Sequence, residues 1–247
     1  MDPTLILILI SVFIVSAISL VGAISLFLRH KTLEKFLFLA IAFAAGSLLG
    51  AAFLDLLPEA MADGAGAGML IFTLLGVLAF FVMEKLLYWR HCHDEDCKVH
   101  NFTYLSLVGD GVHNFIDGMI IAASFLASVP LGITATLAII FHEIPQELGD
   151  FSILLHGGFS KEKALLYNFL IALTAVLGAL AVYFFAPHVQ NLSSVLVPFA
   201  AGGFIYIAAV DLIPELHKET DLKRSALQLI MLICGIGVIW LATIFVH

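Results

Sequence analysis

The chain has 247 residues, of which 62% are hydrophobic and only 12% are charged, and its mean hydropathy is +1.08. A soluble domain carries roughly 25% charged residues, so this composition excludes an ordinary soluble protein and indicates one that resides in a lipid bilayer. The formal net charge of -8 is less informative than the positions of the charges, which are gathered in short segments.

Eight apolar stretches follow one another along the chain, and each is long enough to supply the ~20 residues that a helix needs to cross a bilayer. They cover residues 4–28, 33–57, 68–89, 102–127, 131–155, 164–186, 192–213 and 227–246. The first has no basic residue before it and no small-residue cleavage site after it, so we interpret it as a span and not as a secretory signal. Because backbone groups cannot stay unpaired in lipid, we predict an all-α integral membrane protein with eight transmembrane helices.

Basic residues lie only in or beside alternate connections between these spans. The first, third, fifth and seventh connections hold every Lys and Arg, namely Arg29, Lys31, Lys35, Lys85, Arg90, Lys98, Lys161, Lys163, Lys218, Lys223 and Arg224. The second, fourth and sixth connections hold none. The positive-inside rule then predicts that the odd connections are cytoplasmic and that both termini are outside.

The second and seventh spans share a repeated sequence. FAAGSLLGAAFLDLLPEA at 43–60 aligns without gaps to FAAGGFIYIAAVDLIPEL at 199–216, with 9 of 18 positions identical. Spans that are five apart run in opposite directions, which predicts an inverted repeat of the kind found in secondary transporters. We therefore expect a 3+2+3 arrangement, with one repeat at about 4–89, a loop at 90–101, a central helix pair at 102–156 and a second repeat at about 164–246.

Each copy of the repeat ends in an acidic pair beside a proline. The predicted orientation places Asp55 and Glu59 at the outer mouth of the bundle, and Asp211 and Glu215 at the inner mouth. The alternative interpretation is that these are ordinary acids at a helix end that the proline creates.

The fourth and fifth spans carry polar faces near the middle of the membrane. On the fourth, the spacing i, i+3, i+4, i+7 puts four polar residues on one helical face: Asp110, His113, Asn114 and Asp117. On the fifth, a stripe at intervals of four is flanked by two acids, and together they comprise His142, Gln146, Asp150, Glu143 and Glu147.

The energetic cost of these acids indicates a function. An ionised acid at the centre of a span costs ~3 kcal/mol, so the five acids of this pair would cost on the order of 15 kcal/mol. No Lys or Arg lies deep in a span to offset them. Water, protons or bound cations must do so, and imidazole with carboxylate suits first-row divalent ions such as Zn²⁺, Fe²⁺ and Mn²⁺. A carboxylate proton relay without metal is the less favoured alternative.

HNFIDG in the fourth span and HEIPQELGDF in the fifth resemble the Zrt/Irt-like (ZIP) metal transporters. The resemblance covers nearly the whole chain, and it implies eight helices, outer termini and a binuclear midplane site. It implies that one ion is held by His113, Asp117, His142 and Gln146. It implies that a second is held by Asn114, Asp117 and Glu143, with Glu147 nearby. Gln146 departs from the His or Glu of other members; its neutral oxygen is a weaker ligand, which bears on the choice of Zn²⁺ over Fe²⁺ or Mn²⁺.

The connection RHCHDEDCKVHN between the third and fourth spans is rich in metal-binding side chains. It contains His91, Cys92, His93, Cys97 and His100. Cys/His-rich tracts bind metals, but the spacing of the two cysteines is not that of a zinc finger. We interpret it as a weak ligand cluster that receives or senses ions; the alternative is a plain solvated loop.

Together these features predict a multi-pass transporter of the plasma or inner membrane that carries divalent ions toward the cytoplasm, with Zn²⁺ as the first choice and Fe²⁺, Mn²⁺ or Cd²⁺ as alternatives. Its expected partners are the bilayer, the ions and a second copy in a homodimer, and not nucleic acid. Ions would pass the outer acids, the midplane and then Asp150, His156, Asp211 and Glu215. An intramembrane metal-dependent hydrolase is the alternative, although Gln146 breaks the His-Glu-x-x-His motif. A third interpretation is a metal sensor that transports no ions, which fits the loop but does not explain the repeat.

Overall fold

A computed structural model describes residues 2–27, 30–62, 66–89, 99–188 and 192–246, and within these ranges the chain is helical and has no strand. The helices are α1 (Pro3–Ile18), α2 (Gly22–Ser25), α3 (His30–Ala51), α4 (Leu57–Ala62), α5 (Gly66–Trp89), α6 (Val99–Ala127), α7 (Val129–His156), α8 (Lys161–Ala172), α9 (Thr174–Phe185), α10 (Leu192–Tyr206), α11 (Ile213–Leu216) and α12 (Leu222–Val246). Short 3₁₀ segments at Ser19–Val21 and Ala186–His188 follow α1 and α9. Two π-helical segments, η2 (Ala52–Leu56) and η4 (Ile207–Leu212), follow α3 and α10.

Six of these helical stretches are long and apolar enough to cross a membrane. They are Pro3–Ser25, Lys31–Ala62, Gly68–Leu86, Lys161–His188, Ser194–Leu216 and Leu222–Phe245. They correspond to six of the eight spans expected from the sequence, and they confirm an all-helical membrane protein. The other two expected spans coincide with α6 and α7, which have 29 and 28 residues and carry most of the buried charged groups.

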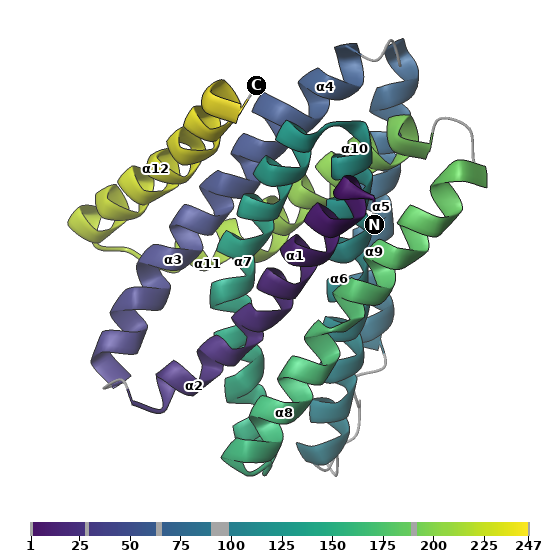
Figure 1. Ribbon diagram of the computed structural model, residues 1–247. Coiled ribbons are helices and arrows are strands. Elements are labelled where there is room, and N and C mark those ends of the chain that lie inside the picture. Colours follow the sequence, from purple (N-terminus) through teal and green to yellow (C-terminus); the bar gives the residue numbers. More distant parts are fainter. Residues whose placement is uncertain (1, 28–29, 63–65, 90–98, 189–191, 247) are drawn as a thin grey trace.

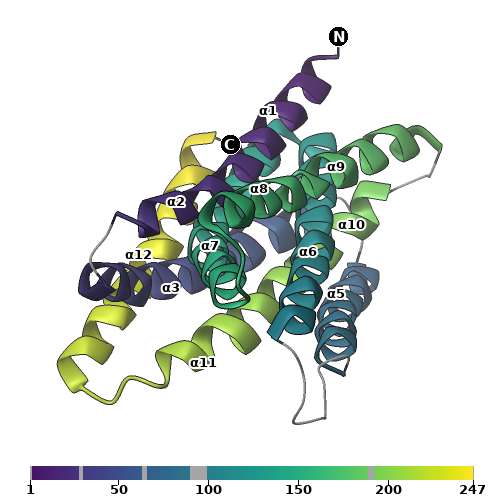
Figure 2. The same ribbon diagram turned by 90° about the horizontal axis from the view of Figure 1, so that it is seen from below.

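Successive long helices run up and down a single bundle (Figure 1). The N-terminal end of α1 and the C-terminal end of α12 both lie in the upper half of that view. Seen from below, α7 lies near the middle of the bundle, while α5 and α12 lie toward opposite edges (Figure 2). In agreement with this view, α7 packs against α1, α3, α6, α8 and α12.

Local sequence explains how the central pair is joined. Ser128 is the only residue between α6 and α7, and its hydroxyl accepts a hydrogen bond from the Leu131 N–H at 3.3 Å, which caps the first turn of α7. Pro130 lies in that first turn, where its missing N–H costs nothing. The short connection makes α6 and α7 antiparallel neighbours that pack against each other.

The two π-helices occur at equivalent places in the sequence repeat. Each contains the repeated aspartate, Asp55 in η2 and Asp211 in η4. In each copy the helix continues beyond the repeated proline, as α4 after Pro58 and α11 after Pro214. The repeated proline therefore does not itself end either helix, and Asp55 and Asp211 lie in π-helical segments before it. Glu215 lies in the last turn of α11, as its interpretation as an ordinary helix-end acid expects. A π segment adds a residue to one turn and often marks a functional site.

Small residues allow close helix contacts in both copies. A side chain at Gly46 of α3 would overlap the backbone carbonyl of Leu232 in α12. At the equivalent position of the repeat, a side chain at Gly202 of α10 would overlap the carbonyl of Thr73 in α5. Contacts of this kind replace the hydrophobic effect as the source of helix association in lipid.

Gly46→Ala and Gly202→Ala should therefore each destabilise the folded protein by about 1–3 kcal/mol, because the added methyl group forces two backbones apart. Gly68→Ala is the matched control, since a side chain there meets nothing within 4 Å. Thermal unfolding in detergent should show a lower midpoint for the first two variants and an unchanged or higher one for the control. Equal midpoints for all three would contradict this account of the packing.

Candidate metal site

Two neighbouring helices bring four metal-binding side chains together. His113 and Asp117 lie one turn apart on the same face of α6, and His142 and Glu143 are consecutive on α7. One ligand atom from each of the four lies within 4.8 Å of all the others. The site thus depends on the i, i+4 spacing of α6 and on the register that the Ser128 connection sets.

The distances between these ligand atoms are those of a coordination shell. His142 Nε2 lies 3.2 Å from Asp117 Oδ2 and 3.5 Å from Glu143 Oε1. His113 Nε2 lies 3.7 Å and 3.6 Å from the same two oxygens. The two Nε2 atoms are 3.3 Å apart. Ligands at about 2.0–2.1 Å from a tetrahedral Zn²⁺ are separated by roughly 3.3 Å, so these four atoms are spaced as the corners of such a site would be.

The backbone and neighbouring rings orient the two imidazoles. His142 Nδ1 lies 3.2 Å from the carbonyl oxygen of Ala138, which favours a proton on Nδ1 and leaves the Nε2 lone pair for a ligand. The edge of Phe80 meets the His113 ring at a centroid distance of 6.2 Å, and Phe204 meets His142 at 6.3 Å. The Nε2 atoms face each other, an arrangement that a cation between them would stabilise.

The site is buried, and no Lys or Arg is among the described buried residues. The four residues are between 0% and 8% exposed. Asp117 Oδ1 and Glu143 Oε2 accept no hydrogen bond. An unpaired buried carboxylate is costly unless it binds a cation or a proton, so the arrangement suits a divalent ion.

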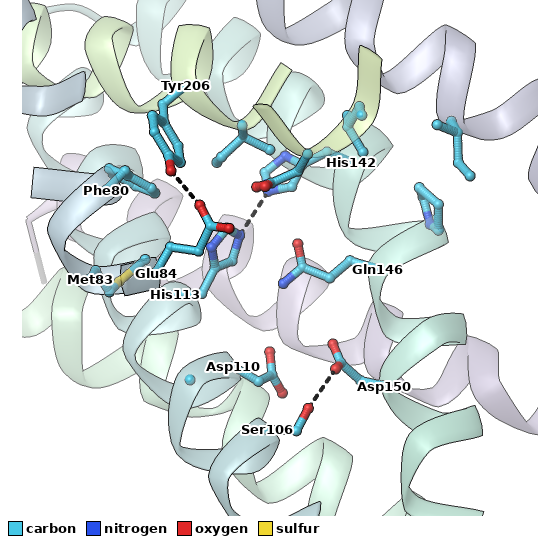
Figure 3. A pocket seen from close by; sticks show the side chains of 16 residues that line it. Phe80, Met83, Glu84, Ser106, Asp110, His113, His142, Gln146, Asp150 and Tyr206 are labelled. Carbon is cyan, nitrogen blue, oxygen red and sulfur yellow. Dashed lines mark hydrogen bonds between the residues drawn. The ribbon is translucent and has the colours of Figure 1, made fainter. Parts of the chain in front are cut away.

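A cavity of ≈ 420 Å³ extends from the two histidines along α6 and α7 (Figure 3). Its acidic lining residues are Glu84, Asp110, Asp150 and Asp211, and its described lining includes no Lys or Arg. Glu84 and Asp211 are exposed, so the cavity reaches the surface. It lies toward the end of the bundle where α5 and α7 finish and α6 begins.

On the other side of the histidines the bundle is filled with apolar side chains. The fully buried residues there include Ile8, Leu48, Leu56, Ile121 and Leu131, each 0% exposed. They come from α1, α3, η2, α6 and α7 and belong to one hydrophobic core. The site is therefore reached through the cavity from one end of the bundle and is covered by packed apolar side chains toward the other.

A second group of buried polar atoms adjoins the first. Asn114 Nδ2 donates to Asp110 Oδ1 at 2.7 Å, so the Asn114 Oδ1 atom is turned away from that contact and accepts no hydrogen bond. Glu147 Oε2 accepts a short hydrogen bond from Asn168 Nδ2 of α8, while its Oε1 accepts none. Orphaned oxygens of this kind fit a further cation or its water ligands.

The fold places the residues predicted from the sequence in several different surroundings. Gln146, Asp110, Asp150 and Asp211 line the cavity, and Asn114 and Glu147 are buried beside the four-residue cluster. Asp55 is buried and accepts a short hydrogen bond from Thr134 on the covered side, where the half-buried Glu59 also lies. The structure does not bring the exposed His156 or Glu215 to the cavity; Glu215 pairs with Lys218. His91, Cys92, His93 and Cys97 lie outside the described residues, and so does the side chain of His100.

Sequence reasoning missed four polar residues that the structure brings to this region, namely Ser106, Glu84, Tyr206 and Asn168. Ser106 lies four residues before Asp110, so the polar stripe of the fourth span could have been extended to it. The hydrogen bond that Tyr206 donates to Glu84 joins α10 to α5, and no local pattern in the sequence predicts it.

Comparison with known proteins decides the family. Residues 90–243 match the sequence profile of the family described as "ZIP Zinc transporter". The chain belongs to the ZIP zinc transporter family. It is 38% identical over 221 residues to "Zinc transporter ZIP13" of Pongo abelii, with 83% of this chain and 66% of the relative covered. It is 33% identical over 261 residues to the protein of that name in Homo sapiens, with 83% and 70% covered.

Membership of the ZIP family confirms the prediction of a transporter and not an enzyme. The hydrolase interpretation is therefore not favoured. The chain also shares 44% identity over 140 residues with "IAA-alanine resistance protein 1" of Arabidopsis thaliana, which covers 56% of this chain and 30% of the relative. The chain thus spans only part of the length of the relatives that it matches.

Removing one ligand of the cluster should weaken binding of Zn²⁺ to the purified protein. His142→Ala should raise the dissociation constant at least about 100-fold, because even residues that only support a ligand change metal affinity by about 10–100-fold. His188→Ala is a matched control, since His188 is exposed and its Nδ1 lies 3.1 Å from the carbonyl oxygen of Phe184, away from the cluster residues. Calorimetric titration measures both, and equal affinities would contradict the assignment.

Proposed function

We propose that this protein carries divalent metal ions, Zn²⁺ first among them, across the membrane toward the cytoplasm through the cluster on α6 and α7. One observation carries the proposal: two imidazole nitrogens and two carboxylate oxygens converge at 3.2–3.7 Å inside an apolar bundle. The printed names of the relatives as zinc transporters support the same cargo.

The chemistry of the ligands supports Zn²⁺ and admits close competitors. A set of two nitrogens and two oxygens is borderline in softness and suits Zn²⁺, Fe²⁺ and Mn²⁺, while Cd²⁺ would fit a slightly larger shell. Gln146 faces the cavity one turn after His142 and supplies a neutral oxygen where a stronger ligand would hold the ion longer. We propose that this weak position eases release.

We propose that a second ion or its water binds beside the first, through Asn114, Asp117 and Glu143, with Glu147 nearby. The unpartnered oxygens of Asn114, Glu143 and Glu147 support this assignment. Two ions that share Asp117 and Glu143 would repel each other, which would lower the affinity of each and favour onward movement.

The closed and open sides of the cluster support alternating access. In the proposed orientation α6 and α7 are the fourth and fifth of eight spans and both termini are outside, so the cavity opens to the cytoplasm. The outer acids Asp55 and Glu59 then lie on the covered side. The matched contacts of α3 with α12 and of α10 with α5 support two inverted repeats that rock against the central pair. The sequence also predicts a loop at 90–101 that receives metal, and a homodimer, and both stay predictions.

Uptake of Zn²⁺ into liposomes that contain a Zn²⁺-sensitive dye tests the function. The wild-type protein should admit Zn²⁺ down a gradient, and Glu143→Gln or His113→Ala should lower the initial rate at least about tenfold. His188→Ala should transport as the wild type does. Absence of uptake by the wild type, or uptake equal to that of the two ligand variants, would sink the proposal.

Zn²⁺ binding should also weaken as the pH falls. Protons compete with the metal for imidazole nitrogen and carboxylate oxygen, so each proton displaced makes the dissociation constant about tenfold larger per pH unit. We expect the affinity measured by calorimetry to fall steadily from pH 7 to pH 5. An affinity that did not change over this interval would show that the ion is held by groups that do not titrate there.

A further inference from the structure

A second set of oxygen atoms faces the cavity below the four-residue cluster. Asp110 and Ser106 lie on one stripe of α6, and Asp150 lies opposite them on α7 (Figure 3). Asp110 and Asp150 point toward each other across the cavity, and the Ser106 hydroxyl donates to Asp150 Oδ1 at 3.3 Å.

Asp110 has a buried carboxylate oxygen that is free to bind a cation. The residue is only 6% exposed, yet it lines the cavity. Its Oδ1 accepts the amide hydrogen of Asn114, whereas its Oδ2 is buried and accepts nothing. An unsatisfied carboxylate oxygen in such a place costs free energy unless a cation, water or proton occupies the space in front of it.

The surroundings favour a cation. The other charged groups that line the cavity are Glu84 and Asp211, both acids, and the titratable rings at its inner end are His113 and His142. No Lys or Arg among the described lining residues competes for Asp110 or Asp150. Hence two carboxyl groups face each other in a cavity whose other acidic and basic lining residues are acids and histidines.

We propose that Ser106, Asp110 and Asp150 form a separate divalent-cation site made only of oxygen ligands, at which the transported ion stops after leaving the two histidines. This inference rests on the proposed function. Asp110 lies three residues before His113 on α6, about 4.5 Å along that helix, and Asp150 lies two turns after His142 on one stripe of α7, about 12 Å along it. Gln146 lies midway between the two on the same stripe.

The ligand chemistry makes this a weaker site than the histidine cluster, from which the ion is more readily released. Nitrogen and oxygen together hold a borderline ion more tightly than oxygen alone, whereas hard ions such as Mn²⁺ lose less on moving to oxygen. With three protein ligands the ion keeps several waters, so binding is weak and exchange is fast. The step from the histidines to this site is therefore one of partial rehydration before release.

Binding of Mn²⁺ to the full-length protein in detergent, followed by electron paramagnetic resonance, tests this site. The wild type should bind a weak class of Mn²⁺ whose spin-echo modulation lacks coupling to imidazole ¹⁴N. Asp150→Asn should remove this class or weaken it at least about tenfold, and Ser106→Ala should weaken it a few-fold. Glu84→Gln removes an acid of the same cavity that lies outside the three ligands, and it should change the affinity by less than about twofold.

Three outcomes would overturn the inference. The first is that Asp150→Asn and Glu84→Gln lower the affinity for Mn²⁺ equally. That result would show that Mn²⁺ responds only to the total negative charge of the cavity. The second is ¹⁴N coupling in every bound Mn²⁺. The third is that no weakly bound Mn²⁺ is found at all, as expected if the two carboxylates share a proton.

Ser106→Ala keeps every charge and is the variant that tests the site if Asp150→Asn does not fold. Zn²⁺ uptake by wild-type liposomes is measured in parallel: uptake without the weak class rejects this site alone, and no uptake rejects the proposed function.

Discussion

The structure depends on the convergence of two imidazoles and two carboxylates inside hydrocarbon. Each of the four groups would prefer water, and their ligand atoms nevertheless lie 3.2–3.7 Å apart with almost no exposure. Such an arrangement is unfavourable without a cation and favourable with one. A bundle that must hold it needs a rigid frame around α6 and α7, and most of the remaining structure supplies that frame.

The frame is made from small residues and apolar side chains. Glycines let α3 approach α12, and α10 approach α5, so closely that backbones touch. Fully buried aliphatic residues cover the cluster on one side, while the opposite side opens into an acidic cavity. This asymmetry between the two sides fits one state of a transporter whose two repeats move about a fixed central pair.

Much of this could be predicted from the sequence, because membrane spans and helical stripes depend on local composition and spacing. The spacing of Asp110, His113 and Asp117 defines one face of a helix, and that face reaches the cavity and the cluster as expected. The one-residue connection at Ser128 makes α6 and α7 neighbours, so His142 and Glu143 were predictable partners.

Other features depend on packing between distant segments and could not be predicted. Nothing local indicates that Tyr206 donates to Glu84, or that Asn168 of α8 reaches Glu147. The π-helices also escaped prediction, because a proline in a helical sequence ordinarily ends the helix. In η2 and η4 the extra residue precedes the proline and the helix continues, so that Asp55 is buried in the bundle and Asp211 lines the cavity where it reaches the surface.

The role of the cluster as the primary metal site can be tested by X-ray absorption at the zinc edge. With one equivalent of Zn²⁺ bound to the full-length protein, the account predicts two imidazole nitrogens and two oxygens at about 2.0–2.1 Å. The multiple scattering of the rings should vanish in the double variant His113→Ala and His142→Ala. A shell containing sulfur at about 2.3 Å would instead place the first ion on cysteine, in the 90–101 connection or at Cys234, and would contradict the account.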